Sequence, residues 1–71
     1  YILEQLSKDE NKNVRAQVAA HPNTSTTILE QLLNDPDSSV RKAIAMRSDT
    51  SASILTQLLE DRSDSVRESV A

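Results

Sequence analysis

The sequence predicts an all-α fold, a right-handed α-solenoid built from paired short helices. It contains two complete copies and one partial copy of a unit of 26 residues. A period of roughly 20–50 residues is typical of stacked repeats, in which each unit buries its apolar face against its neighbours. Apolar residues within each copy recur at helical spacing, and no segment alternates apolar and polar residues as a strand would. Eight columns are identical in the three copies: Ile2/Ile28/Ile54, Leu3/Leu29/Leu55, Gln5/Gln31/Gln57, Leu6/Leu32/Leu58, Asp9/Asp35/Asp61, Val14/Val40/Val66, Arg15/Arg41/Arg67 and Ala19/Ala45/Ala71.

The first helix of the unit is clearest in the second copy. From Ile28 onward, apolar residues occupy positions i, i+1, i+4 and i+5, which share one side of a helix. Thr27 and Glu30 have the spacing of a capping box, so we expect this helix to begin at Thr27. It should end before Pro36, because proline lacks an amide hydrogen and disfavours a helical residue before it.

A second helix should follow the proline. Ser38 or Ser39 can cap it, and it should run to Arg47 with apolar residues at i, i+3 and i+4 from Val40. A helix this short is marginal alone, and part of it could adopt 3₁₀ geometry. The Ala45 column points to close packing on a second face, between neighbouring units.

The turns between helices contain no glycine, since the chain has none. A left-handed residue at a helix end would therefore have to be asparagine or aspartate, the next most tolerant residues. The candidates are Asn23, Asn34 and Asp49.

The chain should fold as one segment over residues 1–71, with repeats at about 1–26, 27–52 and 53–71. Leucine, isoleucine and valine make up 17 of 71 residues, enough for a core. Neither end resembles a polar cap, so we expect a fragment of a longer array that also stacks end to end on itself. No apolar stretch is long enough for a membrane span and no leader opens the chain, which makes a cytoplasmic setting the default expectation.

The columns resemble a known family. Leu29-x-x-Leu32-x-x-Asp35-Pro36, then Val40-Arg41-x-x-Ile44-Ala45 and a turn with Asn-Thr or Asp-Thr, is similar to the leucine-rich repeat variant, an α-solenoid without β-sheet. The unit is about two residues longer than usual for that family, and it lacks the cysteine cluster found in one form of it. The spacing is also similar to HEAT repeats. This resemblance implies a binding scaffold rather than a particular activity.

The resemblance to HEAT units also implies a ladder of ion pairs. In it, each arginine would bond the aspartate of its own unit or of an adjacent unit. The structural ladder would comprise Asp9, Arg15, Asp35, Arg41, Asp61 and Arg67.

Catalysis is not expected. Ser39 and Lys42 have the S-x-x-K spacing of some acyl-transfer enzymes, but the other copies do not repeat it. His21 is the only histidine, there is no cysteine, and no glycine-rich phosphate loop exists. We therefore expect no metal and no cofactor. The Gln5/Gln31/Gln57 column could be an amide ladder, a backbone contact or a row that reads a ligand.

The columns that vary between copies are the candidates for binding. They lie on the second helix, away from the predicted core, and we expect a protein partner with mixed charge there. Nucleic-acid binding by a HEAT-like array is an alternative, disfavoured by 8 basic against 11 acidic residues without a basic cluster. An accessory domain of a larger enzyme is another. The candidate binding residues are Lys42, Met46, Arg47 and Glu68.

Overall fold

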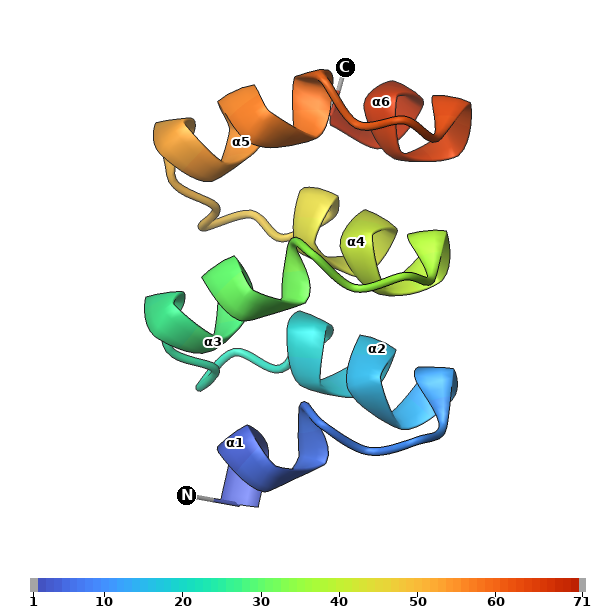
Figure 1. Cartoon of the computed structure of the whole chain (residues 1–71). Helices are drawn as coiled ribbons and strands as arrows, with labels where there is room; N and C mark the ends of the chain where they lie inside the picture. Colours follow the sequence, from blue (N-terminus) through green and yellow to red (C-terminus); the bar gives the residue numbers. More distant parts are fainter. Residues whose placement is uncertain (1, 71) are drawn as a thin grey trace.

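A computed structural model describes residues 2–70 of the chain (Figure 1). This part is helical throughout, without strands, which confirms the predicted all-α class. The helices are α1 (Ile2–Leu6), α2 (Lys12–Ala20), α3 (Thr26–Leu32), α4 (Ser38–Ala45), α5 (Ala52–Leu59) and α6 (Asp64–Val70).

The helices form two columns. Figure 1 shows α1, α3 and α5 on one side of the molecule and α2, α4 and α6 on the other, with each helix pair above the preceding one. The most extensive packing is between α2 and α4 and between α4 and α6. The second helices of successive units therefore hold the helix pairs together. The molecule measures 30 × 21 × 15 Å. None of the helices within residues 2–70 has the length and apolar character needed to cross a membrane.

One continuous core runs between the two columns. The fully covered side chains at its centre include Val40 and Ile44, both 0% exposed. Ala45 is also buried, and α4 packs against both α2 and α6, which confirms the second packing face predicted from the alanine column. The buried apolar residues are Val18, Ala19, Ile28, Leu29, Leu32, Val40, Ile44, Ala45, Ile54, Leu58 and Val66.

The helices begin earlier than the sequence predicted. Ser25, not Thr27, is the N-cap of α3, and its hydroxyl accepts a hydrogen bond from the amide of Ile28. Asp37, not Ser38 or Ser39, is the N-cap of α4. Its carboxylate accepts bonds from both the amide and the hydroxyl of Ser39, at 2.9 and 2.5 Å. Aspartate and serine are about equally favoured as N-caps, and here the Asp37 carboxylate accepts from two donors of Ser39 at once.

The helix ends also differ from the prediction. The second helix ends at Ala45 rather than Arg47. Among residues 2–70 no residue has a positive φ, so none of the three candidates for a left-handed position, Asn23, Asn34 and Asp49, adopts that conformation. The second helices are α-helical over their described lengths, without the 3₁₀ geometry that their shortness suggested.

Threonines help to end α2 and α4 without a left-handed residue. The Thr24 hydroxyl donates to the carbonyl of Val18 at 2.5 Å, and the Thr50 hydroxyl donates to the carbonyl of Ile44 at 2.9 Å. Each carbonyl also accepts from a backbone amide, that of His21 for Val18 and that of Arg47 for Ile44, so each threonine adds a second bond at the helix end.

Candidate functional site

Arg41 lies at the centre of a set of polar contacts that joins the units. Its Nε donates to Asp61 Oδ2 at 2.8 Å, and its Nη1 donates to the carbonyl of Asp35. The Arg41 side chain is 5% exposed and that of Asp61 is 9% exposed. Arg41 therefore bonds the backbone of its own unit and the carboxylate of the next one.

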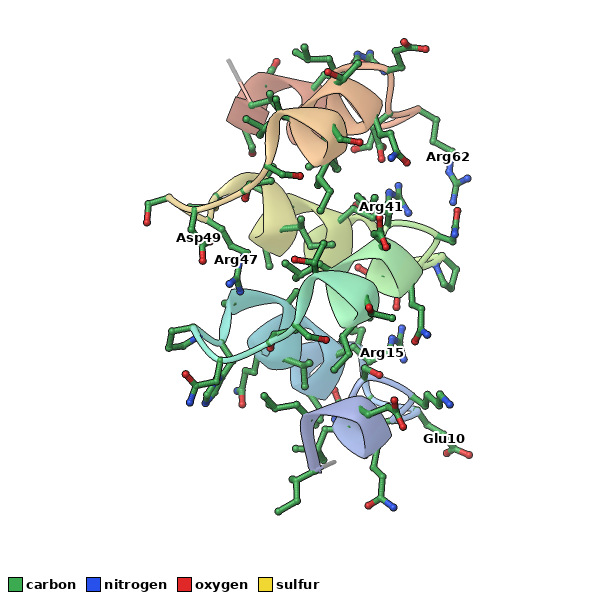
Figure 2. The ribbon with its side chains drawn as sticks, turned by 90° about the vertical axis from the view of Figure 1, so that its left-hand side faces the viewer. Glu10, Arg15, Arg41, Arg47, Asp49 and Arg62 are labelled. Carbon is green, nitrogen blue, oxygen red and sulfur yellow. The ribbon has the colours of Figure 1, made fainter. Side chains whose placement is uncertain are left out.

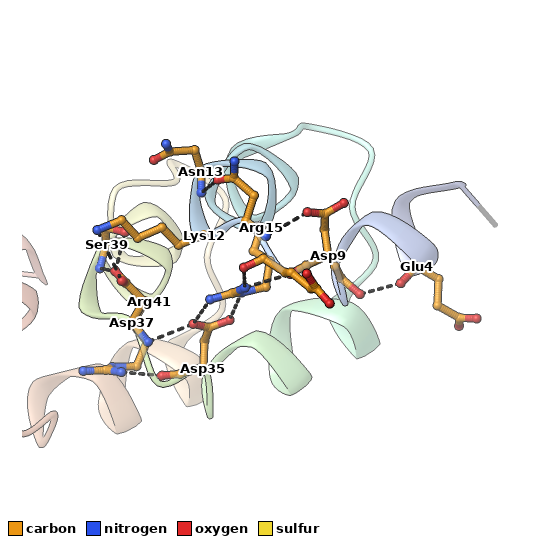
Figure 3. Close-up of polar contacts among 12 residues, drawn as sticks. Glu4, Asp9, Lys12, Asn13, Arg15, Asp35, Asp37, Ser39 and Arg41 are labelled. Atoms are coloured by element: carbon orange, nitrogen blue, oxygen red, sulfur yellow. Dashed lines mark hydrogen bonds and ion pairs between the residues drawn. The ribbon is translucent and has the colours of Figure 1, made fainter.

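Arg15 repeats this arrangement one unit earlier (Figure 3). Its Nε lies 2.7 Å from Asp35 Oδ2, its Nη2 lies 3.3 Å from Asp35 Oδ1, and its Nη1 donates to the carbonyl of Asp9 at 2.7 Å. Hydrogen bonding to Asp35 raises the pKa of the Arg15 guanidinium. The carboxylate partner is again the aspartate of the following unit.

Arg67 occupies the same column in the last unit. It bonds the carbonyl of Asp61, as the other two arginines bond their own aspartates. Its other contact is with the carboxylate of Asp64 in its own helix. The ladder thus joins unit one to two through Arg15 and Asp35, and unit two to three through Arg41 and Asp61.

The aspartates also form the turns between paired helices. The carboxylate of Asp35 accepts from the amide of Asp37 at 2.9 Å, and that of Asp61 accepts from the amide of Ser63 at 2.9 Å. Burial alone would raise the pKa of Asp61, but the Ser63 amide and the Arg41 guanidinium outweigh it and lower the pKa below its usual value. One side chain therefore fixes a turn and an inter-unit contact together.

Arg47 makes a second connection on the opposite edge of the stack, as Figure 2 shows. Its Nη1 donates to the carbonyls of Ala19 and His21 at 2.8 and 2.7 Å, at the C-terminus of α2 in the preceding unit. A cation is stabilised there by the helix dipole. The Arg47 guanidinium also pairs with Asp49 at 3.0 Å and holds the pKa of that carboxyl below its usual value.

A depression lies beside Arg47, over the C-terminal ends of α2 and α4. A hollow of about 220 Å³ is lined by Ala20, Ala43, Met46 and Arg47. A second hollow of about 170 Å³ shares two of these residues, so the two adjoin. The second hollow is lined by Ala20, Pro22, Arg47, Ser48 and Asp49.

The predicted binding residues divide into two kinds. Lys42 and Glu68 are exposed on α4 and α6, and Met46, the residue that follows α4, is 69% exposed at the edge of the depression. The Arg47 side chain is only 6% exposed, because its guanidinium is held against α2. Arg47 thus contributes to the wall of the depression and to the joint between units.

The remaining candidates have local contacts. The Ser39 hydroxyl donates to Asp37, so the S-x-x-K serine belongs to a helix cap. His21 is exposed, and its Nδ1 accepts from the amide of Asn23 at 3.0 Å. Gln31 and Gln57 are exposed on the first helices. Within residues 2–70, no cluster of histidine, cysteine, aspartate or glutamate has a geometry suited to a metal ion.

Sequence reasoning named Arg47 as a candidate binding residue without its link to the preceding unit, and it did not predict the contacts of Thr24 and Thr50. Arg47 has no arginine counterpart in the first copy, so its link to α2 left no repeated signal. Thr24 and Thr50 do recur 26 residues apart, as do Ser25 and Ser51, which cap α3 and α5. That recurrence in the turns could have identified the caps.

Fold and contacts together define a repeat-type scaffold, in which helix pairs are joined by recurring side-chain contacts. The family model of the leucine rich repeat variant matches residues 13–37. This stretch runs through α2 and α3 to the turn before α4, and over it the resemblance predicted from the sequence is confirmed. No curated protein and no solved structure matches the chain.

Proposed function

We propose that the chain is a section of a right-handed α-solenoid that acts as a non-enzymatic, cytoplasmic scaffold and binds a protein partner. Its helix pairs repeat the same buried columns and the same ladder, which leaves the outward positions free to differ between units. A fixed frame with variable outward residues is the arrangement that repeat proteins use to form binding surfaces.

The depression beside Met46 supports the location of the binding surface. Met46 is 69% exposed and borders a hollow whose other lining includes two alanines. Methionine is flexible and polarizable, so it adapts to apolar groups of different shapes. A partner side chain of small or medium apolar size fits between Ala20, Ala43 and Met46.

Charges of both signs on the second-helix column favour a partner with both signs. Lys42 and Glu68 are exposed on α4 and α6, and the Arg47–Asp49 pair lines the hollow that adjoins Met46. Arg15 and Arg41 already bond carboxylates, and the chain has more acidic than basic residues, 11 against 8. A peptide segment with an apolar anchor and flanking charges is therefore favoured over nucleic acid.

A peptide selection tests the proposal. A random-peptide phage library would be selected on the immobilised chain, and the selected peptides synthesised. Met46 is the only methionine, so a ¹³C-methyl label reports on the depression through a single NMR signal. We expect the peptides to shift this signal, and Met46→Asp to weaken their binding by tenfold or more, on the order of the loss of one buried apolar contact.

Glu30→Lys is the control, because Glu30 is exposed on α3, in the other helix column. It should leave the affinity within about twofold. Selected peptides that bind Met46→Asp as tightly as the unchanged chain, or that leave the Met46 methyl signal unmoved, would contradict the proposed site.

A further inference from the structure

One of the identical columns is exposed. The second unit shows this best, because it has a neighbouring unit on each side. There the residues of seven identical columns are buried in the core or in the ladder, whereas Gln31 is exposed. Gln5 and Gln57 are exposed as well. We name these three residues the glutamine row, and burial does not explain why they are identical.

Contacts within the chain do not explain the row either. The sequence leaves open an amide ladder, a backbone contact or a row that reads a ligand. Within residues 2–70, the side-chain amides of Gln31 and Gln57 bond neither each other nor a backbone group. Helix propensity does not require glutamine, since lysine, arginine and glutamate are nearly equal to it, and the exposed column beside the row changes from Glu30 to Thr56. Of the three explanations, contact with another molecule remains.

The row follows the long direction of the stack. The first helices α1, α3 and α5 lie along the left side of Figure 1, which is the side that faces the viewer in Figure 2. The second helices of successive units pack directly on one another, which sets a step of about 8–10 Å from unit to unit. The first helices pack less on each other and are no closer. The chain thus presents one glutamine at each step of about 10 Å.

The charges of the two helix columns differ. Glu4 and Glu30 are the charged residues of α1, α3 and α5, both are exposed, and none of the residues of these helices is basic. Lys8 and Glu60, in the turns after α1 and α5, offset each other. The basic residues within helices are all on the second helices: Lys12, Arg15, Arg41, Lys42 and Arg67. The face of the first helices therefore attracts a cation and repels nucleic-acid phosphates.

The chemistry of glutamine suits a peptide backbone. Its side chain carries an amide oxygen that accepts and an amide nitrogen that donates, the same groups as a peptide bond. A peptide in the extended polyproline II conformation has no internal hydrogen bonds, so its own amide groups are available. It advances about 3.1 Å per residue, and three residues cover about 9 Å. This length is close to the step between units, so each glutamine can meet an equivalent peptide group.

We propose that the first helices bind an extended basic peptide segment that runs along the stack. The glutamine row bonds its main chain at about every third residue. Glu4 and Glu30 pair with its lysine or arginine side chains. This surface is on the first helices, whereas the depression beside Met46 lies over α2 and α4, so the two surfaces can bind separate segments.

Fluorescence anisotropy with a labelled peptide of repeating Lys-Pro-Ala tests the proposal. Proline favours the extended conformation, and about 12 residues at about 3.1 Å each exceed the 30 Å length of the molecule. We expect saturable binding with a dissociation constant below about 1 mM. The matching peptide of repeating Glu-Pro-Ala should bind at least about tenfold more weakly, because it meets like charges.

Glutamine variants of the 71-residue chain separate direct contact from general attraction between charges. Gln31→Ala and Gln57→Ala should each weaken the binding of the Lys-Pro-Ala peptide about two- to tenfold, as expected for one neutral hydrogen bond. Gln17→Ala is the matched control, because Gln17 is exposed on α2, and its affinity should stay within about twofold. These changes leave the net charge unaltered. Glu30→Gln should weaken the binding and reduce its dependence on salt. Circular dichroism verifies that the variants stay helical.

Three outcomes overturn the proposal. The first is a Lys-Pro-Ala peptide that does not bind at about 1 mM. The second is equal affinity of Gln31→Ala, Gln57→Ala and Gln17→Ala for this peptide. The third is a single-stranded thymidine oligonucleotide that binds more tightly than the peptide and loses affinity in the two row variants, which would identify nucleic acid as the occupant. Met46→Asp should bind the Lys-Pro-Ala peptide as the unchanged chain does, so failure here is distinguishable from failure of the proposed function.

Discussion

Replacing Arg41 by alanine removes the ladder contact between the second and third units. Two bonds are lost, one to the carboxylate of Asp61 and one to the carbonyl of Asp35. Breaking a buried ion pair costs about 3–5 kcal/mol when the other charge stays uncompensated. Asp61 is 9% exposed and keeps its bond from Ser63, so we expect a somewhat smaller loss of about 2–4 kcal/mol in the free energy of unfolding.

Urea denaturation followed by circular dichroism measures this loss. The whole chain should be stable by only roughly 4–11 kcal/mol, at about 0.05–0.15 per residue, so the effect is large. With a slope near 1 kcal/mol per molar urea, the midpoint should fall by about 2–4 M. Arg41→Lys keeps the charge without the planar fork and should lose less, which preserves a measurable transition if the alanine variant unfolds.

Arg62→Ala is the matched control, because Arg62 is exposed one residue from Asp61. Its free energy of unfolding should change by less than about 0.5 kcal/mol. If Arg41→Ala keeps its midpoint within about 0.3 M of the unchanged chain, or if Arg62→Ala loses as much, the ladder does not stabilise the stack.

Three further perturbations test separate parts of the fold. The lowered pKa of Asp61 means that it binds protons less readily when folded, so its contribution is full above pH values near 3.8 and is lost as pH falls below them. Asp61→Asn should therefore be less stable at pH 7 and show a smaller further loss in acid, measured by urea titrations between pH 2.5 and 7. Ser25→Ala should cost about 1 kcal/mol and Thr27→Ala much less, because Ser25 is the N-cap; equal effects would contradict this assignment. Ala19→Leu should lower the melting temperature by overpacking the fully buried contact beside α4, at a cost of about 1–3 kcal/mol, and unchanged melting would show that space remains there.

The core and the helix pairing could be predicted from the sequence because they recur. A position such as Val40 is apolar in all three copies and spaced for one helix face, and it is 0% exposed. Because the pattern occurs in three copies, a position that is apolar in all of them can be distinguished from a residue that is apolar in only one copy. The alanine column was informative for the same reason.

The helix starts could be predicted only by comparing the turns of two copies, and the direction of the ladder could not be predicted from the sequence. Ser25, Thr26 and Thr27 are three adjacent hydroxyl residues, and each can act as an N-cap. The choice of Ser25 accompanies the bond from Thr24 to the end of α2, a contact with the previous helix. Whether Arg15 would bond Asp9 or Asp35 likewise depends on the placement of the next unit. Arg15 bonds the carbonyl of Asp9 and the carboxylate of Asp35.

This division of each aspartate between two arginines affects how the molecule unfolds. Asp35 accepts from Arg41 through its carbonyl and from Arg15 through its carboxylate. If the third helix pair detaches, Arg41 loses its carboxylate while it remains attached to the turn at Asp35. Detachment of the terminal pair therefore breaks the Arg41–Asp61 ion pair together with the apolar contacts of that pair. The joint loss favours all-or-none melting over gradual loss of helix pairs.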